Sequence, residues 1–217
     1  MNKMISSAAL AAAIAAGSNA AIVQIDIYGE VEYNLIRDGA LNKFDVTSGA
    51  PVHISFRVDS DVFQNDPDFP TRGYAIDKSS FSATYGSVTL GLQDPYPYAP
   101  GPFFVIRNND PQVDGFFLSN GTAWGVPVST SEPGIFENFG VAFETSYDVN
   151  SLSSLDILGA VGTWNYDGLS TMYFSTVDGG FDAMGLLYDH MTIAVVPAPA
   201  SLLALSPLAL AMTRRRR

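Results

Sequence analysis

Four aspartates within ten residues come nearest, in type and spacing, to a metal site: Asp59, Asp61, Asp66 and Asp68. They follow the alternating stretch Val52–Val58, and we expect them to leave that strand and enter a proline-containing loop. Calcium binds oxygen ligands in flexible loops of this kind. Asp and Pro also form ordinary turns, so a solvated acidic loop explains the same residues. The sequence leaves both interpretations open.

A second polar segment, Asn108–Gly115, places acids at Asp110 and Asp114, as in the first half of an EF-hand loop. Gly121 stands where the closing acid of such a loop would be, and Pro111 favours a turn. We therefore interpret this segment as an ordinary turn.

The sequence contains two histidines, His53 and His190, each beside polar neighbours in an alternating segment. We expect both to point outward from strands, because two imidazoles without cysteines make a poor zinc site. The serine-nucleophile elbow, the Gly-rich phosphate loop and the paired-His zinc motif are all missing from the sequence. A glycosidase would need two carboxylates held about 5 to 10 Å apart, and the sequence indicates no such pair. We predict a protein that is not an enzyme.

The two tryptophans, Trp124 and Trp164, have two interpretations. With the loop residues Tyr96 and Tyr98 they could stack on sugar rings, which would make the domain a carbohydrate-binding or calcium-dependent lectin-like module. In a β-sandwich, however, a tryptophan more often belongs to the core.

The elements that must position these residues have the period of β-strands. Apolar and polar residues alternate in several segments, as expected for strands with one buried face. The apolar members are Val23, Ile25, Ile27, Val31, Tyr33 and Leu35; Val52, Ile54, Phe56 and Val58; Phe139, Val141 and Phe143; and Leu187, Met191, Ile193 and Val195. Turn signals such as Asp38-Gly39 and Asp167-Gly168 separate them. We predict one all-β domain, an antiparallel β-sandwich or jelly roll.

This domain is expected to span residues 21–196 and to be strongly acidic. It holds all 22 acidic residues but six of the eleven basic ones, so its formal charge is −16. Nucleic acid is therefore excluded as an expected partner, because binding it requires basic residues that neutralise phosphates. The chain has no cysteine, so its stability must come from the core and not from disulfides.

Residues 1–20 have the pattern of a secretory signal peptide. Lys3 precedes an apolar stretch, and small residues lead up to a cleavage point expected between Ala20 and Ala21. The alternative is a short N-terminal helix that packs on the domain.

Residues 197–217 form a second unusual segment. It contains Pro197-Ala198-Pro199, an apolar run to Met212, and a terminal cluster of four arginines: Arg214, Arg215, Arg216 and Arg217. The thirteen residues Ala200–Met212 would span only about 20 Å as a helix, against about 30 Å of hydrocarbon. The arginines would stay on the cytoplasmic side. We expect a weak membrane anchor.

Together, the signal peptide and this tail resemble the PEP-CTERM sorting signal of bacterial exported proteins, here with Ala198 in place of the usual central glutamate. The resemblance implies that an exosortase, a membrane-embedded protease, recognises Pro197 and Pro199, and that the four arginines stop transfer. It further implies transient anchoring in the inner membrane, followed by release to the cell surface or extracellular matrix. A structural or adhesive role, with exopolysaccharide as a partner, would fit that location. The alternative is a permanent anchor that is never cleaved.

Overall fold

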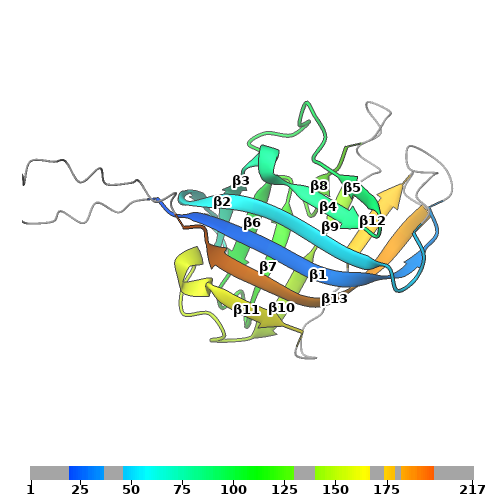
Figure 1. The fold of residues 1–217 in the computed structure, drawn as a ribbon. Helices are drawn as coiled ribbons and strands as arrows, with labels where there is room; N and C mark the ends of the chain where they lie inside the picture. Colours follow the sequence, from blue (N-terminus) through cyan, green and yellow to red (C-terminus); the bar gives the residue numbers. More distant parts are fainter. Residues whose placement is uncertain (1–19, 37–45, 130–139, 167–173, 179–181, 198–217) are drawn as a thin grey trace, which may run out of the picture.

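The computed structural model describes residues 20–36, 46–129, 140–166, 174–178 and 182–197, and in these residues the chain is all-β (Figure 1). The strands belong to one antiparallel sheet of 13 strands. Two short 3-10 helices, η1 (Lys78–Ser80) and η3 (Ile157–Ala160), are the helical elements of the described residues. The strands are β1 (Ile22–Asn34), β2 (Pro51–Asn65), β3 (Thr71–Ile76), β4 (Ser82–Tyr85), β5 (Val88–Leu90), β6 (Phe103–Arg107), β7 (Val113–Ser119), β8 (Val126–Pro127), β9 (Gly140–Ala142), β10 (Glu144–Asp148), β11 (Gly162–Asn165), β12 (Phe174–Asp178) and β13 (Asp182–Val195).

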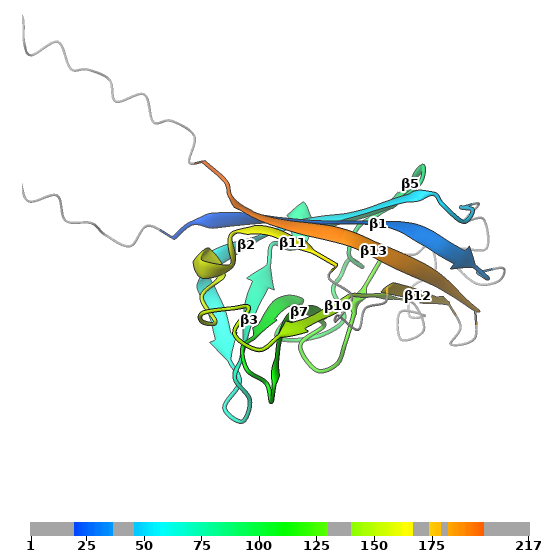
Figure 2. The ribbon, with the colours of Figure 1, turned by 90° about the horizontal axis from the view of Figure 1, so that it is seen from below.

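The sheet curls back on itself. Its order is β10-β7-β6-β3-β2-β1-β13-β12-β9-β8, with β4 and β5 added beside β2 and β11 beside β13. Strands β9 and β10 follow each other in the chain, separated by Phe143 alone, yet they lie near opposite ends of this order. The backbone N–H of Leu118 donates to the carbonyl of Phe143 at that junction, 3.0 Å away. The long strands β1, β2 and β13 therefore lie over β3, β7 and β10, with the core between them (Figure 2).

The predicted antiparallel all-β body is confirmed, and its two-sheet form is not. The described strands make one continuous sheet, so the curl, and not the stacking of two separate sheets, encloses the core. The alternation in β2 is confirmed in full: Val52, Ile54, Phe56 and Val58 are all buried. These residues pack with large aromatic side chains from the opposite layer, including Tyr74, Phe104 and Phe116.

Register shifts overturn the predicted alternation at three apolar residues. Tyr33, Leu35 and Leu187 are each close to half exposed, whereas Leu186 and Ile36 are buried. The pairing of β1 with β13 shifts register twice, between Tyr28 and Gly29 and between Val31 and Tyr33. Each irregularity inserts or removes one residue, and because the side-chain period of a strand is two, it moves the following side chains to the other face.

The aspartate-rich stretch also departs from expectation. Strand β2 does not end at Val58 but continues to Asn65, so Asp59 and Asp61 lie on a strand and only Asp66 and Asp68 lie in the following loop.

Val195, the last apolar residue of the predicted alternation, is also exposed. It is 45% exposed because it lies at the open end of the sheet.

The two ends of the described chain leave the body side by side (Figures 1 and 2). Ala21 lies just before β1, and the N–H of Val196, just after β13, donates to the carbonyl of Ile22, 2.8 Å away. In the described part of the chain, no helix has the length and apolar character needed to cross a membrane.

Several sequence predictions concern residues outside those that the structure describes. Residues 1–19 of the predicted signal peptide are among them, and of the sorting motif only Pro197 is described. The predicted anchor and its stop-transfer charges therefore stay predictions. The named residues outside the described ranges are Lys3, Asp38, Gly39, Phe139, Asp167, Gly168, Ala198, Pro199, Ala200, Met212, Arg214, Arg215, Arg216 and Arg217.

Candidate functional site

A groove of about 610 Å³ lies on the outer side of β3, β6 and β7. Its residues come from three parts of the chain: the end of the β2–β3 hairpin, the outward positions of β6 and β7, and the loop after β7. They are Gln64, Asn65, Asp66, Pro67, Phe69, Thr71, Gly73, Phe103, Val105, Phe117, Ser119, Gly121, Thr122, Ala123 and Trp124.

The floor of the groove is apolar. Strand β6 alternates so that Phe104 points to the core and Phe103 and Val105 point to the groove, yet the latter two are only 8% and 7% exposed. Gly73 lies opposite Val105 on β3, and a Cβ added to Gly73 would come within 3.3 Å of the Phe103 ring. Glycine at position 73 therefore lets the Phe103 ring pack closely against β3 in the floor of the groove.

One rim is the loop between β2 and β3. The Oδ1 atom of Asp66 accepts hydrogen bonds from the backbone N–H groups of Asp68 (2.8 Å) and Phe69 (3.1 Å), which fixes the loop as an Asx turn. The side chain of Phe69 is 58% exposed. This rim thus presents an aromatic ring to solvent on a turn that its own aspartate stabilises.

The other rim is the loop after β7. The Asn120 side-chain oxygen accepts hydrogen bonds from the N–H groups of Thr122 and Ala123, both 2.8 Å away. Gly121 has a φ of +103°, and a Cβ there would lie 3.0 Å from the carbonyl oxygen of Gly101, so the turn requires glycine. Trp124 follows this turn and is 55% exposed.

The lining of the groove is mainly aromatic and polar, which suits a neutral, hydroxyl-rich ligand. Exposed aromatic rings on both rims offer apolar faces, and amide, hydroxyl and carboxylate groups of Asn65, Thr71 and Asp66 lie among them. Asp66 is the one charged residue among those that line the groove in the described structure. Such a lining favours a sugar over an anion, because none of the described lining residues is a cation that could neutralise an anion.

The two tryptophans have different roles. Trp124 lines the groove, whereas Trp164 packs inside, with its ring centroid 4.8 Å from that of Phe116 and 5.2 Å from that of Tyr147. Its indole N–H donates to the carbonyl of Ala160 at 2.8 Å. The structure therefore does not bring Trp124 and Trp164 together as one platform, and Phe69 is the exposed ring that accompanies Trp124.

The loop tyrosines lie elsewhere. Tyr96 packs against the core, with the Lys78 ammonium 5.0 Å from its ring centroid. Burial raises the pKa of the Tyr96 hydroxyl well above its usual value, and the nearby Tyr98 adds to this shift. Neither tyrosine belongs to the residues that line the groove.

The four predicted calcium ligands are spread along a strand and a turn. Asp59 accepts a hydrogen bond from the N–H of Asp61 (2.9 Å), while Asp66 organises the loop that contains Asp68. Among the described residues, no three acidic or histidine side chains are placed to hold one metal ion. The predicted calcium site thus remains a prediction, and turn formation accounts for Asp66.

Asp114, in the segment with partial EF-hand spacing, has a structural role. It is fully buried, and its two oxygens accept hydrogen bonds from the N–H groups of Asn109 (2.7 Å) and Leu152 (2.6 Å). The carboxylate therefore ties the loop before β7 to the loop after β10, in agreement with the turn interpretation.

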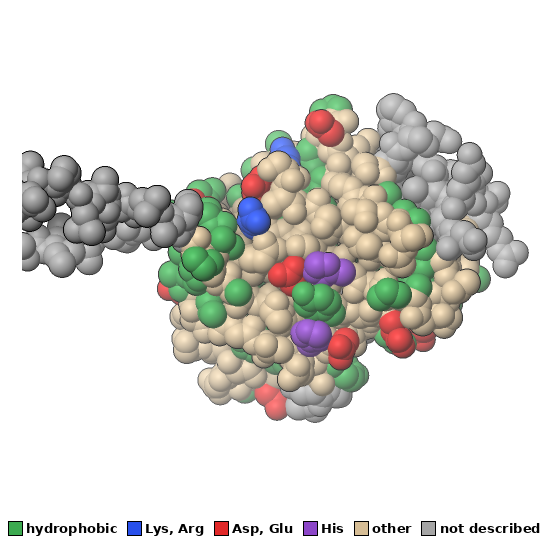
Figure 3. Space-filling model, in the orientation of Figure 1, with side chains coloured by type: hydrophobic (Ala, Val, Ile, Leu, Met, Phe, Trp, Pro, Cys, Tyr) green, Lys and Arg blue, Asp and Glu red, His purple; other side chains and the backbone are tan. Residues whose placement is uncertain are grey.

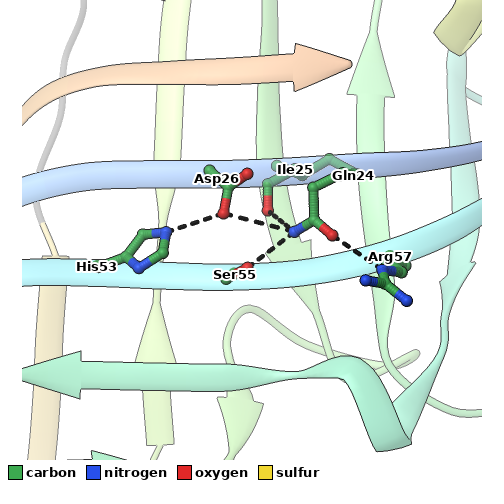
Figure 4. Close-up of polar contacts among 6 residues, drawn as sticks. All are labelled: Gln24, Ile25, Asp26, His53, Ser55 and Arg57. Carbon is green, nitrogen blue, oxygen red and sulfur yellow. Dashed lines mark hydrogen bonds and ion pairs between the residues drawn. The ribbon is translucent and has the colours of Figure 1, made fainter. Parts of the chain in front are cut away.

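The two histidines lie on the outer face of β1, β2 and β13, as predicted (Figure 3). Tyr28 lies between them, with ring centroids 4.7 Å from both His53 and His190. Because the Tyr28 ring separates the imidazoles, they cannot bind a single ion. His53 pairs with Asp26 (Nε2 to Oδ1, 2.8 Å) in a row of polar side chains that includes Gln24, Ser55 and Arg57 (Figure 4).

Comparison with protein-family models, curated proteins and solved structures finds no match for this chain. Functional assignment therefore rests on the residues and their geometry. Of the residues that sequence reasoning singled out, Asp66, Gly121 and Trp124 line the groove. Phe69, Gly73 and Phe103 were missed; Gly73 and Phe103 become neighbours only through the pairing of β3 with β6.

Proposed function

We propose that this chain is an exported, non-enzymatic surface or matrix protein that binds a neutral polysaccharide through the groove between Phe69 and Trp124. The observation that carries this proposal is the pair of exposed aromatic side chains, 58% and 55% exposed, on rims stabilised by their own loop hydrogen bonds. Fixed rings of this kind lose little conformational entropy when a sugar covers them. In this proposal the exported domain acts as a lectin-like module.

Binding is favoured over hydrolysis by the acid content of the groove. Glycoside hydrolysis commonly uses two carboxyl groups, one as acid and one as base or nucleophile. Asp66 is the one carboxylate among the described lining residues, and its Oδ1 atom already accepts two backbone hydrogen bonds. A second carboxylate to complete the pair is not among those residues.

Export rests on the sequence of the two ends. The folded strands begin at Ile22 and end at Val195, next to the expected cleavage point after Ala20 and the proline motif that starts at Pro197. The two ends of the described chain lie beside each other on one side of the body, so a membrane that holds the tail would face that side. We infer that an exosortase processes this tail, and that the two layers of the curled sheet pack as in a sandwich.

The binding experiment is affinity electrophoresis of the chain through gels that contain dextran, galactomannan, xylan or β-glucan. Retardation by at least one neutral polysaccharide, relative to a gel without it, is the expected result, and migration unaffected by any of them would overturn the binding proposal. Running the gels with calcium and with EDTA tests the predicted calcium dependence.

Intact mass spectrometry of membrane and surface fractions tests export. A surface species from Ala21 to about Pro197 is expected, whereas recovery only as a membrane species that retains Arg217 would refute processing.

A further inference from the structure

The end of the body from which both chain ends leave carries exposed apolar side chains. Four residues form this apolar end: Ile22, Leu158, Val161 and Val195. Each is between 42% and 46% exposed, although the domain buries most of its other valines and isoleucines among the described residues. Figure 3 shows hydrophobic side chains gathered at the end of the body where the described chain begins and ends.

Pairing of the strands brings these residues to one place. Val196 bonds to Ile22, which sets Val195 beside the start of β1. Gly162 is the register partner of Ile193, so Val161, one residue earlier in the chain, reaches the same end of β13. Leu158 lies in η3, which ends at Ala160, directly before Val161 and the start of β11.

The chain leaves little distance between this end and the apolar tail. Val196 makes the last hydrogen bond to β1, and the apolar run of the tail begins at Leu202, six residues later. Even a fully extended chain of six residues reaches only about 20 Å. A body tethered in this way cannot move far from the membrane that holds the tail.

We propose that the apolar end is a seating surface, which contacts zwitterionic lipids of the bilayer while the tail is inserted. This contact would hold Pro197 at the membrane surface. This proposal rests on the anchoring part of the proposed function. Four half-exposed aliphatic side chains would not bind a membrane on their own. The tether changes this, because a short linker raises the effective concentration of the second contact to about the millimolar range.

Charge limits the kind of lipid. Asp59 is the register partner of Ile22, and Asp61 follows two residues later, so carboxylates lie beside the apolar end. Anionic headgroups would repel them. The seating surface therefore fits phosphatidylcholine or phosphatidylethanolamine, and added phosphatidylglycerol should weaken the contact.

The lack of cysteine allows a direct test. The variants V161C and L187C each receive one environment-sensitive dye; Leu187 is a matched control because it is 44% exposed and lies on β13, eight residues before Val195. Each chain, running from Ala21 to Arg217, is purified from a host without exosortase and reconstituted in phosphatidylcholine vesicles. Nitroxide-labelled phospholipid serves as the quencher, and flotation reports anchoring.

We expect the dye at position 161 to be blue-shifted and quenched at least about twofold more than the dye at position 187. Chains that float with the vesicles but show equal quenching at both positions would overturn the seating surface and leave the anchor intact. Chains that fail to float would overturn the anchor itself, and the seating surface with it. A blue shift at position 161 that appears without lipid and grows with protein concentration would assign the apolar end to self-association, and would also overturn the proposal.

Discussion

The replacement Trp124→Ala is the sharpest test of the groove. The indole is 55% exposed and follows a turn held by Asn120, so a sugar ring can cover it without any rearrangement of the loop. If the sugar covers roughly 80 Å² of apolar surface, at about 25 cal/mol per Å² the loss is about 2 kcal/mol. That corresponds to a dissociation constant about 30-fold weaker. Because half of the side chain is already in solvent, we expect the free energy of unfolding to fall by less than about 1 kcal/mol.

The assay is affinity electrophoresis with the polysaccharide that retards the wild-type protein most. Tyr166→Ala is the matched control, since Tyr166 is 51% exposed and does not line the groove. Phe69→Ala should weaken binding in the same direction as Trp124→Ala, because it removes the ring on the opposite rim. Equal retardation of wild type and Trp124→Ala, at unchanged stability, would refute the assignment of the groove.

Three further replacements test the groove floor and two tight sites in the fold. Gly73→Val should crowd the Phe103 ring, displace it from the groove floor and weaken polysaccharide binding by at least about tenfold, measured by the same electrophoresis; normal binding would show that the sugar lies elsewhere. Gly115→Ala would drive a Cβ into the backbone carbonyl oxygen of Thr145, and we expect it to cost at least about 3 kcal/mol in urea denaturation. Asp114→Ala removes the acceptors of two backbone N–H groups, of which that of Leu152 is buried, and should cost about 3 kcal/mol. Asp114→Asn keeps one acceptor and should cost less; equal stability of the two variants would contradict this role.

The antiparallel β-structure was predictable because its signal is local. Val52, Ile54, Phe56 and Val58 alternate without interruption, and all four are buried. Alternation fails at Leu187, where the paired strands shift register. A bulge arises from the fit of two strands that are far apart in sequence, so one strand read alone does not reveal it.

The groove was only half predictable for a related reason. An exposed tryptophan was one of two interpretations of Trp124, and a turn was one of two interpretations of Asp66, since both depend on local residue type. The floor depends on β3 lying beside β6, which sets Gly73 opposite Val105. Nothing near Gly73 in the sequence distinguishes it from a glycine in an ordinary turn.

Strand β2 connects the groove to the end of the body where the chain leaves. Its first part pairs with β1 up to Asp59, and its last residues, from Phe63 onward, pair with β3 instead. The register shift between these parts turns the hairpin away from the two chain ends (Figure 2). A straight continuation of β2 along β1 would have carried Phe69 past the emerging ends and toward the proposed membrane. We infer that this bend allows one domain to rest on a membrane at one surface and to keep its sugar-binding groove open at another.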